Sequence, residues 1–320
     1  MIRVKRFLYM AILVVVALAF CMGCSQERKD NQLELRAKGI THMNNGEYAK
    51  ALEAFQAALD ESLGQIGALE LDICYYKAKT QYMLNDIEGA IGTYTAIIGY
   101  NNASKAYYLR GTLYYDQDQE ELALNDYQLA TQYDGKNDYE LYIAIYEAMK
   151  AHGNDQGRTY LEKACEIKGD SAYDKMQKGR IQFMMGVYGE AVNFLQEAAE
   201  GGEPQSYYHL AEVYLATDKM DEAQAAFTSY ISSGIADSDR LYRIADQQME
   251  KENYDIAIRC LEAALKLEQV PNKQIVMKTL VIAYEKTNNF AAARNVLQDY
   301  VNIYPEDEEA KRELTFLETR

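Results

Sequence analysis

The stretch that decides the fold is residues 106–134, AYYLRGTLYYDQDQEELALNDYQLATQYD, in which small and aromatic residues recur at helical spacing. Its second small residue returns along the whole chain, at intervals of 39, 33, 34, 34, 32, 34 and 36 residues. The recurring positions are Ala51, Ala90, Ala123, Gly157, Ala191, Ala223, Ala257 and Ala293. A period near 34 residues indicates a solenoid built from helix pairs. We therefore predict an all-α fold.

Length and composition agree with a repeat architecture. The 320 residues exceed what one compact core usually holds, but in a solenoid each unit contacts only its neighbours. The chain has only 3 prolines, which suits a protein that is mostly helix. Because the repeats leave almost no chain for a catalytic domain, we predict that the protein is not an enzyme.

Motifs of the common catalytic and metal sites are missing from the sequence. It contains no H-E-x-x-H, no G-x-x-x-x-G-K-[ST] and no G-x-S-x-G. Its three histidines, His42, His152 and His209, fall in separate repeats and cannot gather around one metal ion. We expect no metal and no cofactor, and we interpret the many carboxylates as solvated surface.

The first residues form a targeting segment. A basic head of Arg3, Lys5 and Arg6 precedes an apolar run over residues 7–20, which is shorter than the about 20 residues that a membrane-spanning helix needs. An uncleaved anchor over residues 7–22 is one interpretation. Because the basic residues stay inside, the rest of the chain would lie outside the cytoplasmic membrane.

The other interpretation is a lipoprotein signal peptide. The segment Cys21-Met22-Gly23-Cys24 resembles the lipobox of bacterial lipoproteins, although Cys21 stands where that family usually has Leu. The resemblance implies transfer of diacylglycerol to Cys24, cleavage after Gly23, and an acyl chain on Cys24. It implies a location at the bacterial cell membrane, lipid-anchored, on the extracytoplasmic face. A redox C-x-x-C is rejected because Cys21 lies inside the apolar run.

Charge restricts the partners. The chain carries a net −16, and without the three basic residues of its leader it carries −19. Such a charge repels nucleic acid and anionic membrane surfaces, so attachment must rest on the lipid or anchor. Residues 24–31 are polar and predict a short tether. The remaining cysteines, Cys74, Cys165 and Cys260, fall in separate repeats, so we expect unpaired, buried thiols.

The periodic pattern resembles the tetratricopeptide repeat over residues 32–305. Three repeats carry the resemblance best: Tyr107, Gly111, Tyr114, Ala123, Tyr127 and Ala130; Tyr207, Leu210, Ala211, Tyr214, Ala223 and Phe227; and Leu280, Tyr284, Ala293, Leu297 and Pro305. The resemblance implies a right-handed α-solenoid of about eight antiparallel helix pairs. Residues 306–320 are expected to form a capping helix that seals the last apolar face.

Small residues and turn residues fit helix pairs. We expect the two helices of a pair to approach most closely at Gly39, Gly111, Gly179, Ala78, Ala211 and Ala245. Turns are predicted at Asn45-Gly46, Asn85-Asp86, Gly153-Asn154 and Asn288-Asn289. A longer connection is expected over residues 60–67, and the fourth repeat has a wide turn over residues 153–157.

The resemblance implies that the first helix of each pair lines a concave surface. Two positions seven residues apart share that face. They carry the predicted partner-binding residues Tyr75, Tyr82, Tyr108, Tyr115, Tyr142, Met149, Phe183, Tyr208, Tyr242 and Met249. Tyrosine offers contact area and a hydroxyl, and methionine adapts to irregular partners. The alternative is that these side chains belong to the packing consensus of the repeat.

These observations favour a membrane-anchored extracytoplasmic scaffold that binds protein or peptide partners in a Tyr/Met-lined groove. The alternative is a ligand-binding lipoprotein that takes a glycan or a peptide in the same groove, because aromatic faces stack on sugars as well. Partner identity and oligomeric state remain open.

Overall fold

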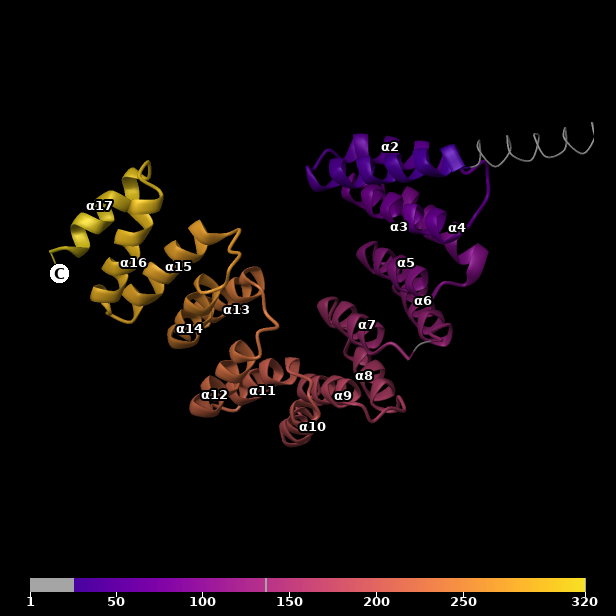
Figure 1. Ribbon diagram of the computed structural model, residues 1–320. Coiled ribbons are helices and arrows are strands. Elements are labelled where there is room, and N and C mark those ends of the chain that lie inside the picture. The colour runs from indigo at the N-terminus through magenta and orange to yellow at the C-terminus, as the bar shows by residue number, and fades with distance from the viewer. Residues whose placement is uncertain (1–25, 136, 320) are drawn as a thin grey trace, which may run out of the picture. The chain divides into compact units, whose positions relative to one another are not determined.

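The computed structural model describes residues 26–135 and 137–319, and every regular element in these ranges is a helix (Figure 1). A helix over residues 26–44 pairs with α2 (Tyr48–Asp60). The following pairs are α3 (Ala68–Met83) with α4 (Ile87–Asn101), α5 (Ser104–Asp116) with α6 (Glu120–Gln132), α7 (Tyr139–Ala151) with α8 (Arg158–Cys165), α9 (Ala172–Met184) with α10 (Tyr188–Glu200), α11 (Gln205–Ala216) with α12 (Met220–Ser232), α13 (Ser238–Glu250) with α14 (Tyr254–Leu265), and α15 (Lys273–Lys286) with α16 (Phe290–Ile303). The all-α fold of repeated helix pairs is confirmed.

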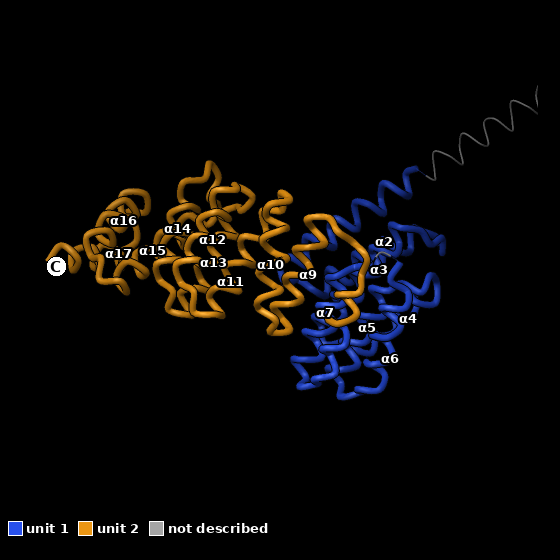
Figure 2. Tube along the Cα trace, turned by 90° about the horizontal axis from the view of Figure 1, so that it is seen from below, with its two compact units in different colours: residues 1–160 blue, residues 161–320 orange. Residues whose placement is uncertain are grey.

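The chain divides into two compact units, Met1–Tyr160 and Leu161–Arg320, and the boundary falls within α8 (Figure 2). In unit 1, Phe55, Ile73 and Tyr127 are among the fully buried side chains. In unit 2, one large cluster runs through successive repeats from Met176 to Leu317. In unit 1 one buried cluster joins α2 to α3 through Phe55 and Ile73, and a second runs from Ala78 of α3 to Tyr160 of α8, so in both units buried side chains connect successive repeats.

The predicted close approaches between paired helices are confirmed. A Cβ atom added to Gly39 would lie 2.6 Å from Phe55 Cε1, and one added to Gly179 would lie 2.5 Å from Leu195 Cγ. At Gly111 the nearest atom would be a Tyr127 ring carbon at 3.0 Å. These separations are too short for a methyl group in unchanged surroundings, so the absent side chain sets the spacing of the two helices.

One backbone turn repeats in every helix pair. A residue with positive φ ends the first helix of each pair, and the next N–H donates to the carbonyl five residues earlier at 2.8–2.9 Å. This hydrogen bond is that of a Schellman motif. The left-handed residues are Gly46, Asn85, Asp118, Gly153, Gly186, Asp218, Glu252 and Asn288. The four turns predicted from Asn and Gly pairs are confirmed, and the others carry acidic residues or a single Gly.

Two repeats depart from the regular pattern where we expected them to. The connection after α2 runs over residues 61–67 and contains two left-handed residues, Leu63 (φ 52°) and Gly64 (φ 81°). In the fourth repeat a 3-10 turn, η1 (Asp155–Gly157), precedes an α8 of only 8 residues. The longer connection and the wide turn are both confirmed.

The predicted tether is wrong over residues 26–31, because these residues are helical and continue into the first helix of repeat 1. Gln26 Nε2 donates to Asp30 Oδ1 at 2.9 Å across one helical turn, which stabilises this segment locally. Gln32 is buried and donates to Glu70 Oε1 of α3 at 2.9 Å, so the helix is held to the next repeat. Polar composition alone did not distinguish an exposed helix from a tether. The predicted signal peptide and Cys24 lie outside the described residues.

The capping helix expected after Pro305 is α17 (Glu308–Leu317), which packs on α16. It buries Ala310, Leu314 and Leu317. Its N-cap is Asp307, whose carboxylate accepts the N–H of Ala310 at 3.1 Å. The apolar end of the last repeat is thereby covered.

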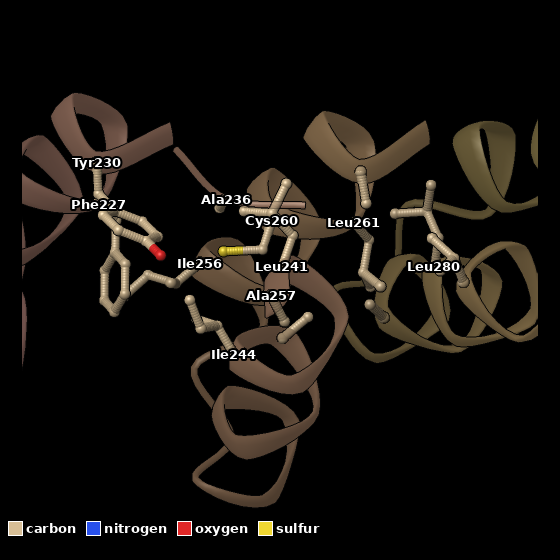
Figure 3. Close-up of a cluster of buried hydrophobic side chains, with 14 of the residues drawn as sticks. Phe227, Tyr230, Ala236, Leu241, Ile244, Ile256, Ala257, Cys260, Leu261 and Leu280 are labelled. Carbon is tan, nitrogen blue, oxygen red and sulfur yellow. The ribbon is translucent and has the colours of Figure 1, made fainter. Parts of the chain in front are cut away.

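The cysteines are partly as expected. Cys260 is buried between aliphatic side chains, with Ile256, Leu241 and Ile244 around it (Figure 3). Cys74 and Cys165 are only half-buried. Within residues 26–135 and 137–319 no disulfide forms, no group of metal-ligating side chains gathers, and no helix is long and apolar enough to cross a membrane.

Candidate functional site

Unit 1 contains a groove of about 550 Å³ along the first helices of repeats 2 and 3. We call it the unit 1 groove. Its lining comes from α3 (Asp72, Tyr75, Tyr76, Lys79, Tyr82), α4 (Tyr94) and α5 (Lys105, Leu109, Thr112, Leu113, Asp116). Two of the predicted partner-binding residues, Tyr75 and Tyr82, therefore lie together in one hollow.

Packing behind the groove orients Tyr75. The ring centroids of Tyr75 and Tyr94 are 6.2 Å apart, and Lys105 Nζ lies 5.0 Å from the Tyr75 centroid, in cation–π geometry. Burial raises the pKa of Tyr94 to about 12 and also raises the pKa of Tyr75, so both hydroxyls stay protonated at neutral pH. Tyr82 is 44% exposed and offers its ring to solvent.

The charges of the groove are not equally available. Asp72 pairs with Arg36 at 2.5 Å, and the Arg36 guanidinium also lies 5.2 Å from the Tyr76 ring centroid. Asp116 lies 3.6 Å from His152 Nε2. Lys79 and Lys105 are exposed, and neither pairs with a carboxylate of the described residues. In a chain of net −16, this hollow therefore offers aromatic faces beside two available ammonium groups.

Two other predicted tyrosines of unit 1 lie outside the groove lining. Tyr108 of α5 is half-buried and stacks on Tyr127 with centroids 6.0 Å apart. Tyr142 of α7 is half-buried, and burial raises its pKa. Tyr108 and Tyr142 pack against the core of unit 1, as in the alternative interpretation that we kept open.

The prediction that Tyr115 and Met149 contact a partner is wrong, because the structure buries both side chains, with 4% and 1% exposure. The turn after α7 covers Tyr115: the His152 ring stacks on it at 4.7 Å, and Asn154 Nδ2 donates to its hydroxyl at 2.9 Å. Met149 packs where Gly157 permits close approach, since a Cβ there would lie 3.0 Å from Met149 Cβ. Neither side chain can contact a partner.

Unit 2 has a separate hollow of about 440 Å³. It includes the predicted residue Phe183 from α9, together with Leu215, Ala216 and Glu212 of α11, Asp218, Met220, Lys251 and Asn253. Tyr242 and Met249 of α13 are half-buried and pack against the core of unit 2. The predicted ladder is thus reduced in unit 2 to one aromatic side chain in a mixed polar and apolar hollow.

Tyr208 and His209 of α11 form a half-buried polar cluster. The Tyr208 ring lies 5.7 Å from that of Tyr230, with the Arg240 guanidinium 5.9 Å from its centroid, and burial raises the pKa of Tyr208. His209 Nδ1 lies 2.9 Å from Glu212 Oε2. Burial lowers the pKa of His209, so we assign a neutral ring that donates Nδ1–H to the carboxylate.

The sequence reasoning missed the charged residues of the unit 1 groove. It followed the aromatic positions of the repeat and passed over Asp72 and Lys79 of this groove. A signal was present, because Asp72 and Lys79 are seven residues apart and flank Tyr75 at helical spacing. The same face that carries the tyrosines therefore carries the charges.

Sequence models and the helix pairs agree on the family. Two models described as tetratricopeptide repeat match the chain, one over residues 36–99 and 242–308 and the other over residues 104–137 and 204–233. Together they cover more than half of the chain. This chain belongs to the tetratricopeptide repeat family. Members of this family generally bind protein partners and are generally non-catalytic scaffolds.

Individual relatives are distant. The BBSome complex member BBS4 homolog of Drosophila melanogaster is 25% identical over 158 residues, which are 45% of this chain and 32% of the relative. The match thus spans about a third of the length of this curated relative.

Solved structures share the helical repeat. A tetratricopeptide repeat protein from Parabacteroides merdae is 16% identical, with 79% of this chain and 99% of that chain covered, at a TM-score of 0.45. The C-terminal part of a TPR repeat-containing protein from Cytophaga hutchinsonii is 20% identical, with 76% and 98% covered, at a TM-score of 0.40. Similarity at this level does not extend to function.

Proposed function

We propose that the protein is a membrane-anchored extracytoplasmic scaffold that binds a protein or peptide partner in the unit 1 groove. The observation that carries the proposal is the joining of Tyr75, Tyr82, Lys79 and Lys105 in one open hollow. Aromatic rings of this kind supply contact area at low entropic cost, and lysine stems add apolar surface beside a charge. An extended peptide or a partner helix meets such a surface along the first helices.

The anchor is proposed from the leader. A basic head, an apolar run and the pair Gly23-Cys24 together resemble a lipoprotein signal, and a diacylglycerol with an acyl chain on Cys24 would hold the repeats at the outer face of a bacterial cytoplasmic membrane. The family supplies the scaffold part of the proposal. The Drosophila relative is named as a member of the BBSome complex, which agrees with a partner-binding role.

The test uses the full-length protein in its native membrane. A photoreactive benzoylphenylalanine replaces Tyr82 in the groove, and in a matched control it replaces Tyr133, which is 42% exposed at the end of α6 and outside the groove. We expect a protein adduct from position 82 that is absent from position 133, identified by mass spectrometry.

Affinity measurement completes the test. With the captured protein purified, Tyr82→Ala should weaken binding at least tenfold, as for an aromatic hot spot, while Tyr133→Ala should leave it within twofold. Equal adducts from the two positions, or equal affinities of the two alanine variants, would contradict the proposal. Binding of a glycan to the groove, with no protein adduct from position 82, would favour the ligand-binding alternative.

A further inference from the structure

The longer connection between α2 and α3 carries an apolar tip. Leu63 is 70% exposed and Ile66 is 51% exposed, while Tyr100 at the end of α4 is 52% exposed. Ile66 and Tyr100 are in contact, because the Tyr100 hydroxyl donates to the Ile66 carbonyl at 3.1 Å, and Leu63 lies three residues before Ile66 in the same connection. Single exposed apolar residues are ordinary, but a gathered set marks a contact surface.

The tip continues into an apolar hollow of about 460 Å³ below it, lined by Leu59, Leu71, Cys74 and Ile97 among others. Within the tip, backbone N–H groups donate to nearby backbone carbonyls. Leu63 N–H donates to Asp60 O at 3.2 Å, and Gln65 N–H donates to Ser62 O at 3.1 Å. Apolar side chains on a self-satisfied turn suit contact with a poorly hydrated surface.

The start of the described chain lies beside this tip. Arg28 and Lys29 line the same hollow of about 550 Å³ as Glu61, Leu63 and Gln65. The helix is already formed at Gln26, and Cys24 is only two residues earlier. Two residues span at most about 7 Å, so a lipid on Cys24 would hold this end of unit 1 directly at the bilayer.

Charges around the tip are mixed. Glu27 and Asp30 accompany Arg28 and Lys29 on the exposed first turns, and Asp60, Glu61 and Glu70 lie at the tip, so the proposed contact rests on apolar side chains and not on attraction to anionic lipid. Tyrosine with an apolar ring and a polar hydroxyl is enriched at membrane interfaces. The exposed apolar side chains of the tip, and its place beside the start of the described chain, therefore suit the lipid interface.

We infer that the tip, residues 61–66 with Tyr100, inserts into the lipid interface and orients unit 1 on the membrane. The inference rests on the proposed lipid anchor at Cys24. Because residues 26–31 are helical, only residue 25 lies in sequence between Cys24 and the described helix. The tip thus contacts the boundary between the headgroups and the acyl chains of the same membrane that holds Cys24.

The test exploits the absence of tryptophan from the chain. Leu63→Trp places the only tryptophan of the chain at the tip, and Leu122→Trp places it at a matched leucine of α6 in the same unit, 48% exposed. The full-length proteins, purified in detergent, are reconstituted into phosphatidylcholine vesicles with or without brominated acyl chains. Ile66→Trp serves as a second tip variant, and circular dichroism checks the fold of each.

We expect blue-shifted emission from the tip variants and at least twofold stronger quenching by bromolipid than for Leu122→Trp. Equal quenching at positions 63 and 122 in protein that floats with vesicles and carries lipid on Cys24 would overturn the inference and leave the anchor intact. Blue-shifted but unquenched emission would assign the tip to a protein contact and also overturn it. If mass spectrometry finds no lipid on Cys24, the anchor itself fails and the inference fails with it.

Discussion

Arg110 and Asp126 form a two-pronged ion pair between the helices of the third repeat, with Nε 2.8 Å from Oδ2 and Nη2 2.8 Å from Oδ1. Asp126 is 1% exposed, and the guanidinium also lies 5.7 Å from the ring centroids of Tyr107 and Tyr114. A bidentate pair of this kind fixes one helix against the other and satisfies a buried carboxylate.

We predict that Asp126→Ala lowers the free energy of unfolding of unit 1 by about 3 kcal/mol, because it leaves the enclosed Arg110 cation without its partner. Urea denaturation followed by circular dichroism measures the change. Glu121→Ala on the exposed side of α6 is the control and should stay within about 0.5 kcal/mol of the parent. An effect of Asp126→Ala no larger than that of the control would show that the pair contributes nothing net.

Two glycines of the fifth repeat should respond to alanine with opposite signs. Gly179→Ala places a methyl group 2.5 Å from Leu195 Cγ and should destabilise by about 1–3 kcal/mol through overpacking. Gly189, in α10, has open space around its Cα, and alanine there should stabilise by up to about 1 kcal/mol through helix propensity. Unfolding midpoints of the two variants give the answer, and a shift of the same sign in both would contradict the packing argument.

Asp307 should make the attachment of α17 sensitive to acid. Its carboxylate accepts from Lys278 Nζ at 2.7 Å and from the Tyr300 hydroxyl at 2.8 Å, and the Lys278 bond leads in holding the pKa of Asp307 far below its ordinary 3.8. A depressed folded pKa gives stability that is complete above the unfolded pKa and is lost as pH falls through the folded one. Asn at this position keeps the N-cap and removes the charge.

The free-energy difference between the parent and Asp307→Asn should therefore be largest above about pH 5 and shrink as pH falls below 4. This difference is measured by hydrogen exchange of the α17 amides in the parent and in Asp307→Asn. Glu318→Gln, just past the end of α17, is the charge-matched control and should show no such convergence. A constant difference across this range would remove Asp307 from the account of acid stability.

His209 gives unit 2 a second pH dependence, at milder acidity. Burial lowers its pKa below the ordinary 6.5, and Arg180 and Arg240 act in the same direction, while Glu212 opposes them. Below about pH 6.5 the unfolded chain thus binds a proton that the folded chain resists, so stability falls with pH in that range. His209→Gln should weaken the dependence of the thermal unfolding midpoint of unit 2 on pH between pH 7.5 and 5. His42→Gln in unit 1 should leave that dependence unchanged. An unaltered slope in His209→Gln would contradict the assignment of a neutral ring.

Much of the fold was predictable because it depends on local steric requirements. Gly39, Gly111 and Gly179 report close helix contacts through the mere lack of a side chain, and the Asn-Gly turns report left-handed backbone. The left-handed backbone at Glu252 could not be predicted, because glutamate is not a residue type that favours this conformation. The same holds for residues 26–31, where a polar string is compatible with either a helix or a tether.

The candidate site was less predictable, because exposure depends on neighbours that are distant in sequence. Tyr82 and Tyr115 occupy equivalent positions of successive repeats, yet one is 44% exposed and the other 4% exposed. The difference arises from His152 and Asn154, which fold over Tyr115 from the following repeat. No rule of spacing within one repeat contains that information.

The eight left-handed turns have a consequence for how such a chain changes over time. Their shared hydrogen bonds join main-chain atoms, and the same bend is found with glycine, asparagine, aspartate or glutamate at the left-handed position. The charge of the residue at each of these turns is thus separable from the path of the main chain. Single substitutions at these turn residues can therefore change which partners bind while the backbone keeps its path.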